Sequence, residues 1–399
     1  MVDIERVYTV DFAYPEPERT TEPWRAPWSV EARVANPMSR YPRYAPVRAE
    51  WLPDLGGFGV IVEATDGTIG FATGSHGTPV ASLIDEYLGP RIEGEPATAV
   101  EKIHDMLRRL CSPFGAAGLA SYAVSAVDLA LWDLKGRMAG QPVYELLGGP
   151  ARDELRCYAT GNDTDWHLEL GFEGTKLACP YGPADGKVGL QENVELVAET
   201  SELVGPEVEV MLDCWMAFDE SYTVRLAERV REYDLYWIEE ALPPENVAAH
   251  RAVRNRLPGQ TLATGEHWYT PERFQQAASD RLVDIVQPDI NWVGGLTALR
   301  KICDIAAAAG IRVIPHGGGN TPYGQHACYA LPDIPWAEYF LASPPGVPLE
   351  ESARLPGVPV PADGQLIPSD RPGFGVELES VKFTGSFTGG SGPPEDFER

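Results

Sequence analysis

Short apolar runs that end in a reactive polar side chain recur through the second half of the chain. The runs cover residues 208–212, 235–238, 261–265, 282–288 and 311–315. The side chains after them are Asp213, Glu239 with Glu240, Glu266 with His267, Asp289 and His316, spaced 23–27 residues apart. This interval fits one strand, one helix and two short loops. The pattern is typical of a parallel β/α barrel, whose active site lies at the carboxyl ends of the strands.

Further strands extend this pattern on both sides. Two are predicted at 155–160 and 171–178 and one at 337–341, which makes eight strands in total. A solenoid can also have a repeat of this length. The repeats share no consensus beyond strand, polar end and helix, so we predict a barrel rather than a solenoid.

The front of the chain follows a different pattern. Residues 4–10 alternate like a strand, and 58–73 are typical of a hairpin around Asp66-Gly67. Residues 11–55 follow neither a strand nor a helix period and are rich in Pro, Arg, Tyr and Trp, as in a lid or binding loop. Helical spacing predicts helices at 79–88, 97–111 and 118–140.

These patterns predict an α/β protein of two domains. The barrel is expected at 141–344, with an α+β capping (lid) domain at 1–140. After about residue 345 the chain is rich in Pro and Gly with short strands, as at 373–378, and we expect 345–385 to complete the capping domain. Residues 386–399 have the composition of a disordered tail.

The net charge of the chain restricts the classes of partner that it can bind. A formal net charge of −27 disfavours nucleic-acid binding, which needs a basic face. Acidic self-repulsion is best tolerated where salt screens it, so we hypothesise a high-salt cytoplasm; an ordinarily acidic bacterial enzyme is the alternative. No apolar run is long enough for a membrane helix, and the N-terminus has no secretory pattern, so a cytoplasmic location is expected.

Three of the strand-end residues carry carboxylates on consecutive strands. Because neighbouring strands lie about 4.8 Å apart, Asp213, Glu239 and Glu266 can meet at one cation. All-oxygen ligands favour Mg²⁺, with Mn²⁺ second. The spacing leaves open whether Glu239 or Glu240 points inward. The six cysteines lack paired spacing and argue against a zinc cage.

His316 and Asp289 end the next two strands. A carboxylate that is hydrogen-bonded to one imidazole nitrogen fixes the tautomer and raises the basicity of the other nitrogen. We interpret His316 as a general base and Asp289 as its orienting partner. The glycines after His316 lack the Lys and Ser/Thr of a phosphate-binding loop.

Taken together, these residues resemble the enolase superfamily, mandelate racemase subgroup. The helix S-A-V-D-L-A-L-W-D-L-K-G at 125–136 and P-V-Y-E-L-L-G-G at 142–149 are similar to its hallmark sequence at the junction of lid and barrel. Longer stretches are similar to one branch, the L-rhamnonate dehydratases. They include A-N-P-M-S-R-Y at 35–41, W-I-E-E-A-L-P-P at 237–244 and Q-P-D-I-N-W-V-G-G at 287–295.

The resemblance implies a barrel capped by both chain ends and a specific chemistry. Mg²⁺ would bind the carboxylate of an aldonate, L-rhamnonate first, and stabilise the enediolate formed by proton removal. Glu239 would be the ligand of its pair, and Glu338 would hydrogen-bond the substrate carboxylate or the enediolate. His316 would remove the C2 proton and protonate the departing C3 hydroxyl, giving a 2-keto-3-deoxy sugar acid. Homo-oligomers, tetramers or octamers, are also implied.

The chain departs from the superfamily pattern at two positions. Ala178 stands where racemising members carry a second lysine after Lys176, which removes a base from the opposite face. Arg33 stands where the rhamnonate branch has a substrate-contacting histidine, which leaves the exact sugar acid open. We expect Arg33 and Arg48 of the lid to recognise the substrate. Lys176 and His267 are further candidates for substrate contact.

Several alternative functions compete with the hypothesis of a rhamnonate dehydratase. Another aldonate, such as xylonate, arabinonate, mannonate or gluconate, would need the same chemistry. An acid-sugar epimerase or racemase is disfavoured by Ala178. A metallohydrolase would need more histidine ligands than His267 and His316. A non-catalytic binding barrel would not require a general base and metal ligands at the ends of successive strands.

Overall fold

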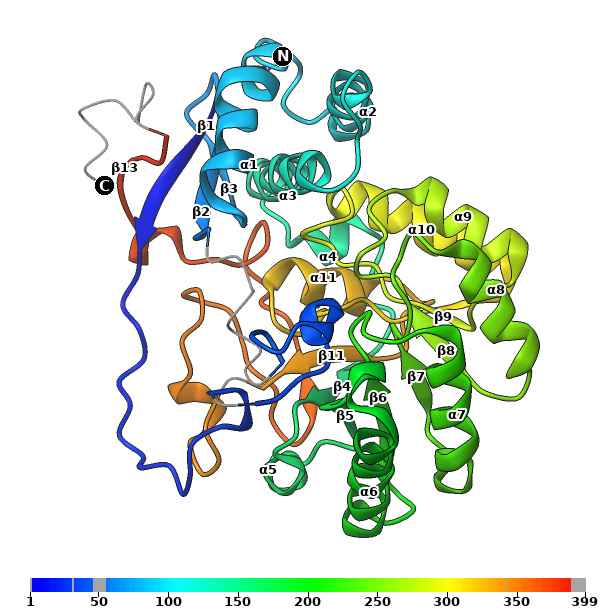
Figure 1. The fold of residues 1–399 in the computed structure, drawn as a ribbon. Coiled ribbons are helices and arrows are strands. Elements are labelled where there is room, and N and C mark those ends of the chain that lie inside the picture. Colours follow the sequence, from blue (N-terminus) through cyan, green and yellow to red (C-terminus); the bar gives the residue numbers. More distant parts are fainter. Residues whose placement is uncertain (1, 31, 46–54, 342, 389–399) are drawn as a thin grey trace.

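The computed structural model describes residues 2–30, 32–45, 55–341 and 343–388. It contains an antiparallel sheet with helices at one end and a parallel strand barrel with helices around it (Figure 1). The predicted α/β barrel with an α+β capping region is confirmed. Within the described residues, no helix is long and apolar enough to cross a membrane.

The capping sheet has four antiparallel strands in the order β13-β1-β2-β3. Asp66 and Gly67 form the turn of the predicted hairpin: Gly67 has φ +82°, and the Asp66 carboxylate accepts from Thr68 N at 2.9 Å. The strand bounds are β1 Ile4–Ala13, β2 Phe58–Ala64, β3 Ile69–Gly74 and β13 Lys382–Ser386.

The helices α1 Gly77–Leu83 and α3 Leu119–Ala139 pack on this sheet, and α2 Val100–Cys111 packs against α3. α3 is apolar on nearly all sides and is buried along most of its length, as a helix packed from both sides must be. Gly70 of β3 lies so close to α3 that a Cβ there would collide with the Ala130 carbonyl. The buried Asp133 carboxylate accepts from Phe71 N at 3.0 Å and from Phe374 N at 2.8 Å, which ties α3 to β3 and to the C-terminal segment.

The barrel contains all eight predicted strands, hydrogen-bonded in the order β10-β9-β8-β7-β6-β5-β4-β11. Each pair along this path is parallel, and the last strand, β11, pairs with the first, β4, as a barrel requires and a solenoid of successive repeats does not. The strands are β4 Leu155–Thr160, β5 Gly174–Ala178, β6 Glu209–Asp213, β7 Trp237–Glu239, β8 Leu262–Thr264, β9 Ile285–Val286, β10 Arg312–Val313 and β11 Ala337–Phe340.

The loop after β10 joins the two ends of this path. Gly319 N donates to the Glu338 carbonyl of β11 at 2.7 Å, and the Asn320 side chain exchanges two hydrogen bonds with the backbone of Phe340, at 2.8 and 2.9 Å. The loop that carries His316 is therefore fixed to the strand that carries Glu338.

Helices follow the barrel strands as the alternation predicts. A short helix, α4 Val143–Leu146, precedes the first of them. The others are α5 Thr164–Glu169, α6 Gly186–Val204, α7 Glu220–Val230, α8 Val247–Arg256, α9 Pro271–Asp280, α10 Gly295–Ala309 and α11 Pro322–Ala330.

Large side chains fill the barrel interior beneath the strand ends. The Tyr158 ring centroid lies 5.4 Å from that of Trp237 and 5.8 Å from that of Trp336, and the same cluster contains Met211, Ala263, Ile285 and Ile314. The interior is a packed core, so polar side chains above it are held in fixed positions.

The C-terminal region differs from the sequence prediction in two places. The segment at 373–378 is not a strand, and the short strands of this region are β12 Gln365–Leu366 and β13. Residues 386–388 belonged to the predicted tail, but Ser386 pairs with Val10 and the Phe387 ring lies 5.3 Å from Phe58. An exposed strand edge and an apolar contact explain why this polar stretch is ordered. Residues 389–399 lie outside the described residues.

Candidate active site

The three predicted metal ligands lie at the ends of consecutive strands. Asp213 is the last residue of β6 and is the register partner of Glu239, the last residue of β7; Glu266 follows β8 by two residues. Asp213 accepts from Trp215 N at 2.9 Å. Partial removal from water and the charge of Glu239 raise the pKa of Asp213 well above its usual value.

Glu239 points into the barrel and is held by three donors. Its Oε1 accepts from Lys176 Nζ at 2.5 Å, and its Oε2 accepts from Trp237 Nε1 at 2.8 Å and Gln287 Nε2 at 2.7 Å. Burial raises the pKa of Glu239, against the lowering effect of Lys176. Glu239 therefore has the inward position, which the spacing left open and the family resemblance implied.

Glu240 points to a different partner. Its backbone has φ +44°, a left-handed conformation that residues other than glycine rarely adopt. Its Oε1 lies 2.7 Å from Nδ1 of His267, and its Oε2 is buried without a partner among the described residues. Burial and the charge of Glu266 raise the pKa of Glu240 to about 7.

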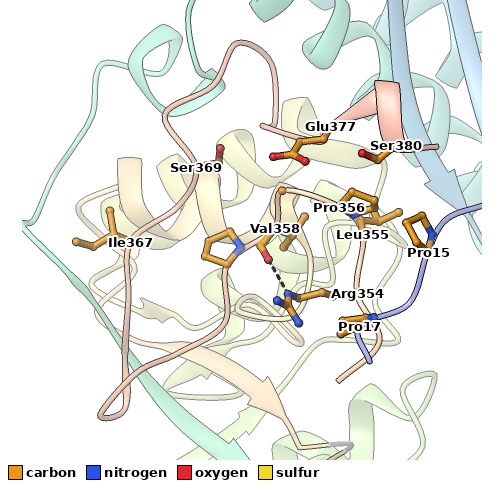
Figure 2. A pocket seen from close by; sticks show the side chains of 12 residues that line it. Pro15, Pro17, Arg354, Leu355, Pro356, Val358, Ile367, Ser369, Glu377 and Ser380 are labelled. Carbon is orange, nitrogen blue, oxygen red and sulfur yellow. Dashed lines mark hydrogen bonds between the residues drawn. The ribbon is translucent and has the colours of Figure 1, made fainter. Parts of the chain in front are cut away.

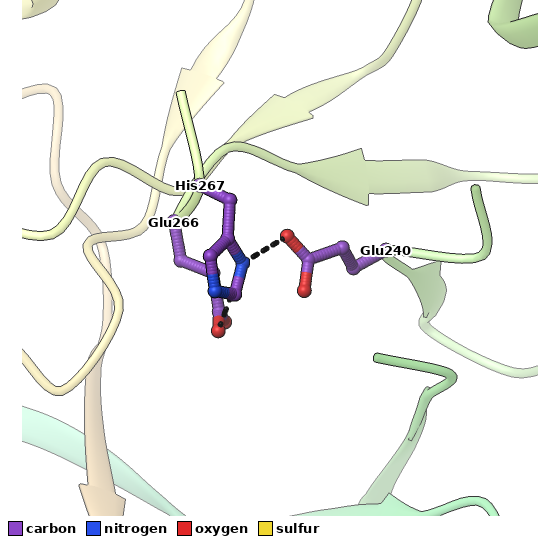
Figure 3. A group of neighbouring side chains, drawn as sticks. All are labelled: Glu240, Glu266 and His267. Atoms are coloured by element: carbon purple, nitrogen blue, oxygen red, sulfur yellow. Dashed lines mark hydrogen bonds and ion pairs between the residues drawn. The ribbon is translucent and has the colours of Figure 1, made fainter. Parts of the chain in front are cut away.

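Glu240, Glu266 and His267 form a compact group (Figure 3). One ligand atom from each lies within 4.8 Å of the others. His267 Nδ1 is 3.5 Å from Glu266 Oε1, and the His267 ring stands between the two carboxylates. Burial opposes the charge on His267, but Glu240 overcomes it and raises the pKa of His267 to about 9.

The predicted donor set fits a divalent cation by its chemistry, whereas the group whose ligand atoms lie within 4.8 Å of one another among the described residues is Glu240, Glu266 and His267. Asp213, Glu239 and Glu266 supply only oxygen, as Mg²⁺ prefers. The pKa values of Asp213 and Glu239 are raised because the site concentrates negative charge away from water. A cation bound by Asp213, Glu239 and Glu266 would offset this concentration of negative charge.

His316 and Asp289 form the predicted pair. His316 Nδ1 lies 2.7 Å from Asp289 Oδ2, and His316 Nε2 lies 3.6 Å from Glu266 Oε2. Burial opposes the charge on His316, but Glu266, Glu338 and Asp289 overcome it and hold the pKa of His316 well above its usual value. With Nδ1 on Asp289, the free nitrogen of the ring faces the carboxylates.

Lys176 and Glu338 complete the inner wall. Lys176 Nζ is 2.8 Å from Glu338 Oε1, and Glu338 also accepts from Thr160 Oγ1 at 2.5 Å and from Gly317 N at 3.0 Å. Burial opposes the charge on Lys176, but Glu239 and Glu338 hold its pKa well above the usual value. Burial likewise disfavours ionised Glu338, but Lys176 lowers its pKa to about 2.

The contacts of Arg33, the described lid candidate, are with the protein and not with the strand-end carboxylates. The Arg33 guanidinium forms an ion pair with Asp185, donates to the Pro180 carbonyl at 3.3 Å and stacks on the Tyr181 ring at 4.6 Å. It is therefore bound to the loop after β5. Arg48 lies outside the described residues. His326 is buried in α11, where it accepts from Tyr144 N at 3.3 Å and packs on Phe374.

The sequence prediction missed two residues of this site. The Trp292 ring lies 5.0 Å from His316 and 5.5 Å from His267, and its other neighbour is Tyr122 of α3 at 5.7 Å. Gln287 holds Glu239. Both residues stand within three positions of Asp289, and their polar or aromatic character on that strand end was the available signal.

A separate pocket of about 430 Å³ lies between the chain after β1 and the C-terminal segment (Figure 2). Pro15, Pro17, Pro356 and Glu377 line it, and Arg354 donates to the Val358 carbonyl at 3.1 Å. None of the residues that line it is a predicted site residue. This pocket is therefore separate from the group of side chains at the strand ends.

Fold and site define an enolase-type barrel enzyme, and the comparisons agree. The family description "Enolase C-terminal domain-like" matches residues 164–382, and "Mandelate racemase / muconate lactonizing enzyme, N-terminal domain" matches residues 59–148. The chain belongs to the mandelate racemase / muconate lactonizing enzyme family of the enolase superfamily.

Within this family the chain is similar to proteins named for one activity. An L-rhamnonate dehydratase from Saccharopolyspora erythraea is 42% identical over 354 residues, 88% of this chain and 90% of that protein. A crystal structure of L-rhamnonate dehydratase from Gibberella zeae has a TM-score of 0.84 at 32% identity and covers 94% of this chain and 93% of that one. A second structure of rhamnonate dehydratase from Gibberella zeae, complexed with Mg, has a TM-score of 0.86 at 33% identity, with the same coverage.

Proposed function

We propose that this protein is a Mg²⁺-dependent hydro-lyase that removes water from C2 and C3 of an aldonate, with L-rhamnonate as the first candidate. The observation that carries the proposal is the His316–Asp289 pair, whose free imidazole nitrogen faces the carboxylate cluster. The names of the relatives support the same reaction.

Asp213, Glu239 and Glu266 would hold the metal ion. Mg²⁺, when bound, would supply positive charge to the substrate carboxylate and to the enediolate that develops from it. Mn²⁺ has similar ligand preferences and is the second candidate. Lys176 forms ion pairs with both Glu239 and Glu338. Its ammonium group would also donate a hydrogen bond to the substrate carboxylate.

His316 would move the protons. Positive charge bound by the carboxylates would offset their effect on the raised pKa of His316 and favour its neutral form. In that form Nε2 takes the proton from C2, while Asp289 holds Nδ1–H and stabilises the imidazolium that forms. The same imidazolium then gives its proton to the C3 hydroxyl as the C–O bond breaks. Glu338, fixed by Thr160 and Gly317, would position the carboxylate end of the substrate. The enol product rearranges to a 2-keto-3-deoxy sugar acid.

A single base favours elimination over racemisation. Ala178 stands at the end of β5, and its backbone is bonded to the Asn162 side chain at 2.8 and 3.0 Å. No titratable group from this position faces the site, so proton return from the opposite face lacks a donor there. An aldonate other than L-rhamnonate is the second candidate, because Arg33 replaces the histidine of the rhamnonate branch.

A panel of aldonates tests the proposal. Purified protein with Mg²⁺ should convert at least one member, L-rhamnonate first, to a 2-keto-3-deoxy acid. Absence of turnover over the whole panel would reject the proposal, and C2 epimerisation without water loss would favour an epimerase. Light scattering on the same sample tests the tetramer or octamer that the family resemblance implies.

A further inference from the structure

We propose that a cavity outside the barrel wall, between the chain around the end of β1 and the segment after β11, is a binding site for a small hydroxy acid whose carboxylate is held by Arg354. The cavity has a volume of about 260 Å³. Pockets for drug-sized ligands hold roughly 300–1,000 Å³, so this one suits a small metabolite. The inference does not depend on the reaction proposed above.

The cavity lies on the outer side of β11. Successive side chains of a strand point to opposite faces, so Tyr339, which lines the cavity, points away from the inward-facing Glu338. Tyr339 is accordingly not a member of the hydrophobic cluster that fills the barrel interior. Asn320 and Thr321 close the cavity from the loop that carries His316. The cavity therefore contacts two segments of the active site from outside, and none of its lining residues is a predicted site residue.

Arg354 is the only charged residue among the described residues that line the cavity. In a chain with a formal net charge of −27, a cavity lined by one cation and no carboxylate is a specific feature. The Arg354 side chain is held by carbonyl groups. Its Nε donates to Val358 O at 3.1 Å (Figure 2), and its Nη1 donates to Glu350 O at 2.6 Å and Ser352 O at 3.0 Å.

These contacts orient the guanidinium of Arg354 without neutralising it. Within the part of the chain that the structure describes, no carboxylate forms an ion pair with Arg354, and its Nη2 donates to no protein group. A carboxylate is the partner that a guanidinium binds best, because charge-assisted hydrogen bonds are stronger than neutral ones. The free Nη2 donors are therefore suited to the carboxylate of a small acid.

Hydroxyl groups surround the guanidinium. Burial raises the pKa of Tyr339 to about 12 and the Arg354 charge opposes this effect, so the phenol and the guanidinium lie close together. The Ser352 hydroxyl is buried and has no hydrogen-bond partner among the described residues. Thr73 and Thr321 add further hydroxyls to the lining. Because a buried hydroxyl without a partner is unfavourable, a ligand that carries hydroxyls as well as a carboxylate fits this lining.

The pocket of Figure 2 is a poorer site for an anion. It shares Arg354 with the cavity, but the Glu377 carboxylate also lines it. Repulsion from Glu377 would oppose a bound carboxylate there. We therefore assign the acid to the cavity beside Tyr339.

Titration calorimetry with glycerate and with glycerol tests the site, because the two probes differ in the carboxylate. The full-length protein is titrated in EDTA, so that glycerate cannot bind through a metal ion at the strand ends. We expect glycerate to bind with a Kd in the millimolar range and glycerol to give no binding heat at the same concentrations. Absence of glycerate binding, or equal binding of glycerol, would overturn the inference.

A pair of arginine variants makes the test specific. Arg354→Gln should weaken glycerate binding about 10-fold or more, the effect of losing hydrogen bonds from a charged donor. Arg371→Gln is the matched control, because Arg371 belongs to the same C-terminal segment, pairs with Glu377 and does not line the cavity. It should bind glycerate like the wild type.

A third variant covers the case in which Arg354→Gln loses its fold along with its carbonyl contacts. Ala353 is exposed and lines the cavity, so Ala353→Phe should fill the cavity at an unchanged Tm. It should abolish glycerate binding while Arg354 keeps its contacts. Wild-type affinity in Ala353→Phe, or in folded Arg354→Gln, would overturn the inference.

Discussion

His316 Nδ1 lies 2.7 Å from Asp289 Oδ2, and the opposite ring nitrogen of His316 faces Glu266 at 3.6 Å. The two side chains come from loops after different strands, β10 and β9, and are 27 residues apart in sequence. Their contact converts two separate strand-end residues into one acid–base unit.

The first prediction concerns this unit. Asp289→Asn should lower kcat about 10²- to 10⁴-fold, because the amide cannot stabilise the imidazolium or enforce the tautomer. His316→Asn should lower it at least as far. If the two residues act together, the double variant should be no slower than His316→Asn alone. Additive losses in steady-state assays would show that the residues act separately.

The second prediction distinguishes the possible metal ligands. Mg²⁺ bound at 100 times its Kd should stabilise the folded protein by about 2.7 kcal/mol. Asp213→Asn, Glu239→Gln and Glu266→Gln should each abolish the Mg²⁺-dependent rise in Tm. Glu240→Gln should retain it. The reverse result, with loss only in Glu240→Gln, His267→Gln and Glu266→Gln, would assign the ion to the group in Figure 3.

The third prediction concerns pH. Glu240 raises the pKa of His267 from 6.5 to about 9 in the folded chain, against the effect of burial. A raised folded-state pKa stabilises the protein fully below about pH 6.5, and this contribution is lost as pH rises through about 9. In metal-free buffer, wild type and His267→Gln should therefore differ most in unfolding free energy near pH 6 and converge above pH 9. A constant difference from pH 6 to 10 would contradict the assignment.

The fourth prediction concerns Arg33. Its guanidinium is committed to Asp185, Pro180 and Tyr181, so we expect it to fix the lid on the loop after β5. Arg33→Gln and Asp185→Asn should then raise KM by similar factors, and the double variant should add little. A KM effect in Arg33→Gln that is absent in Asp185→Asn would instead indicate direct contact with substrate.

The fifth prediction concerns salt. With a formal net charge of −27, repulsion between surface carboxylates should destabilise the fold in dilute buffer, and screening should relieve it. Tm should rise as KCl increases from about 0.05 to 1 M, where the Debye length falls to about 3 Å. Undiminished stability at low salt would remove the case for a high-salt cytoplasm.

The sequence predicted the parts of the fold that depend on local periodicity. The eight barrel strands were predicted from short runs that recur at regular intervals along the chain. The same interval predicted that Asp289 and His316 lie together at the strand ends. The orientation of Glu239 and Glu240 could not be predicted from spacing and was implied only by the family resemblance, because it depends on the left-handed backbone of Glu240, with φ +44°.

Contacts between residues that are distant in sequence could not be predicted either. Arg33 pairs with Asp185, 152 residues away, and Ser386 pairs with Val10 at a sheet edge. Neither contact follows from spacing, since each depends on how the lid and the chain end lie across the folded molecule.

The most direct test of the central claim is the product formed from L-rhamnonate with Mg²⁺ by wild type and by His316→Asn, purified in parallel and shown to have equal Tm. The account predicts that the wild type releases the 2-keto-3-deoxy acid and that His316→Asn forms essentially none. Wild-type turnover by His316→Asn would contradict it, because the reaction would then not depend on the base that the fold places at the strand ends.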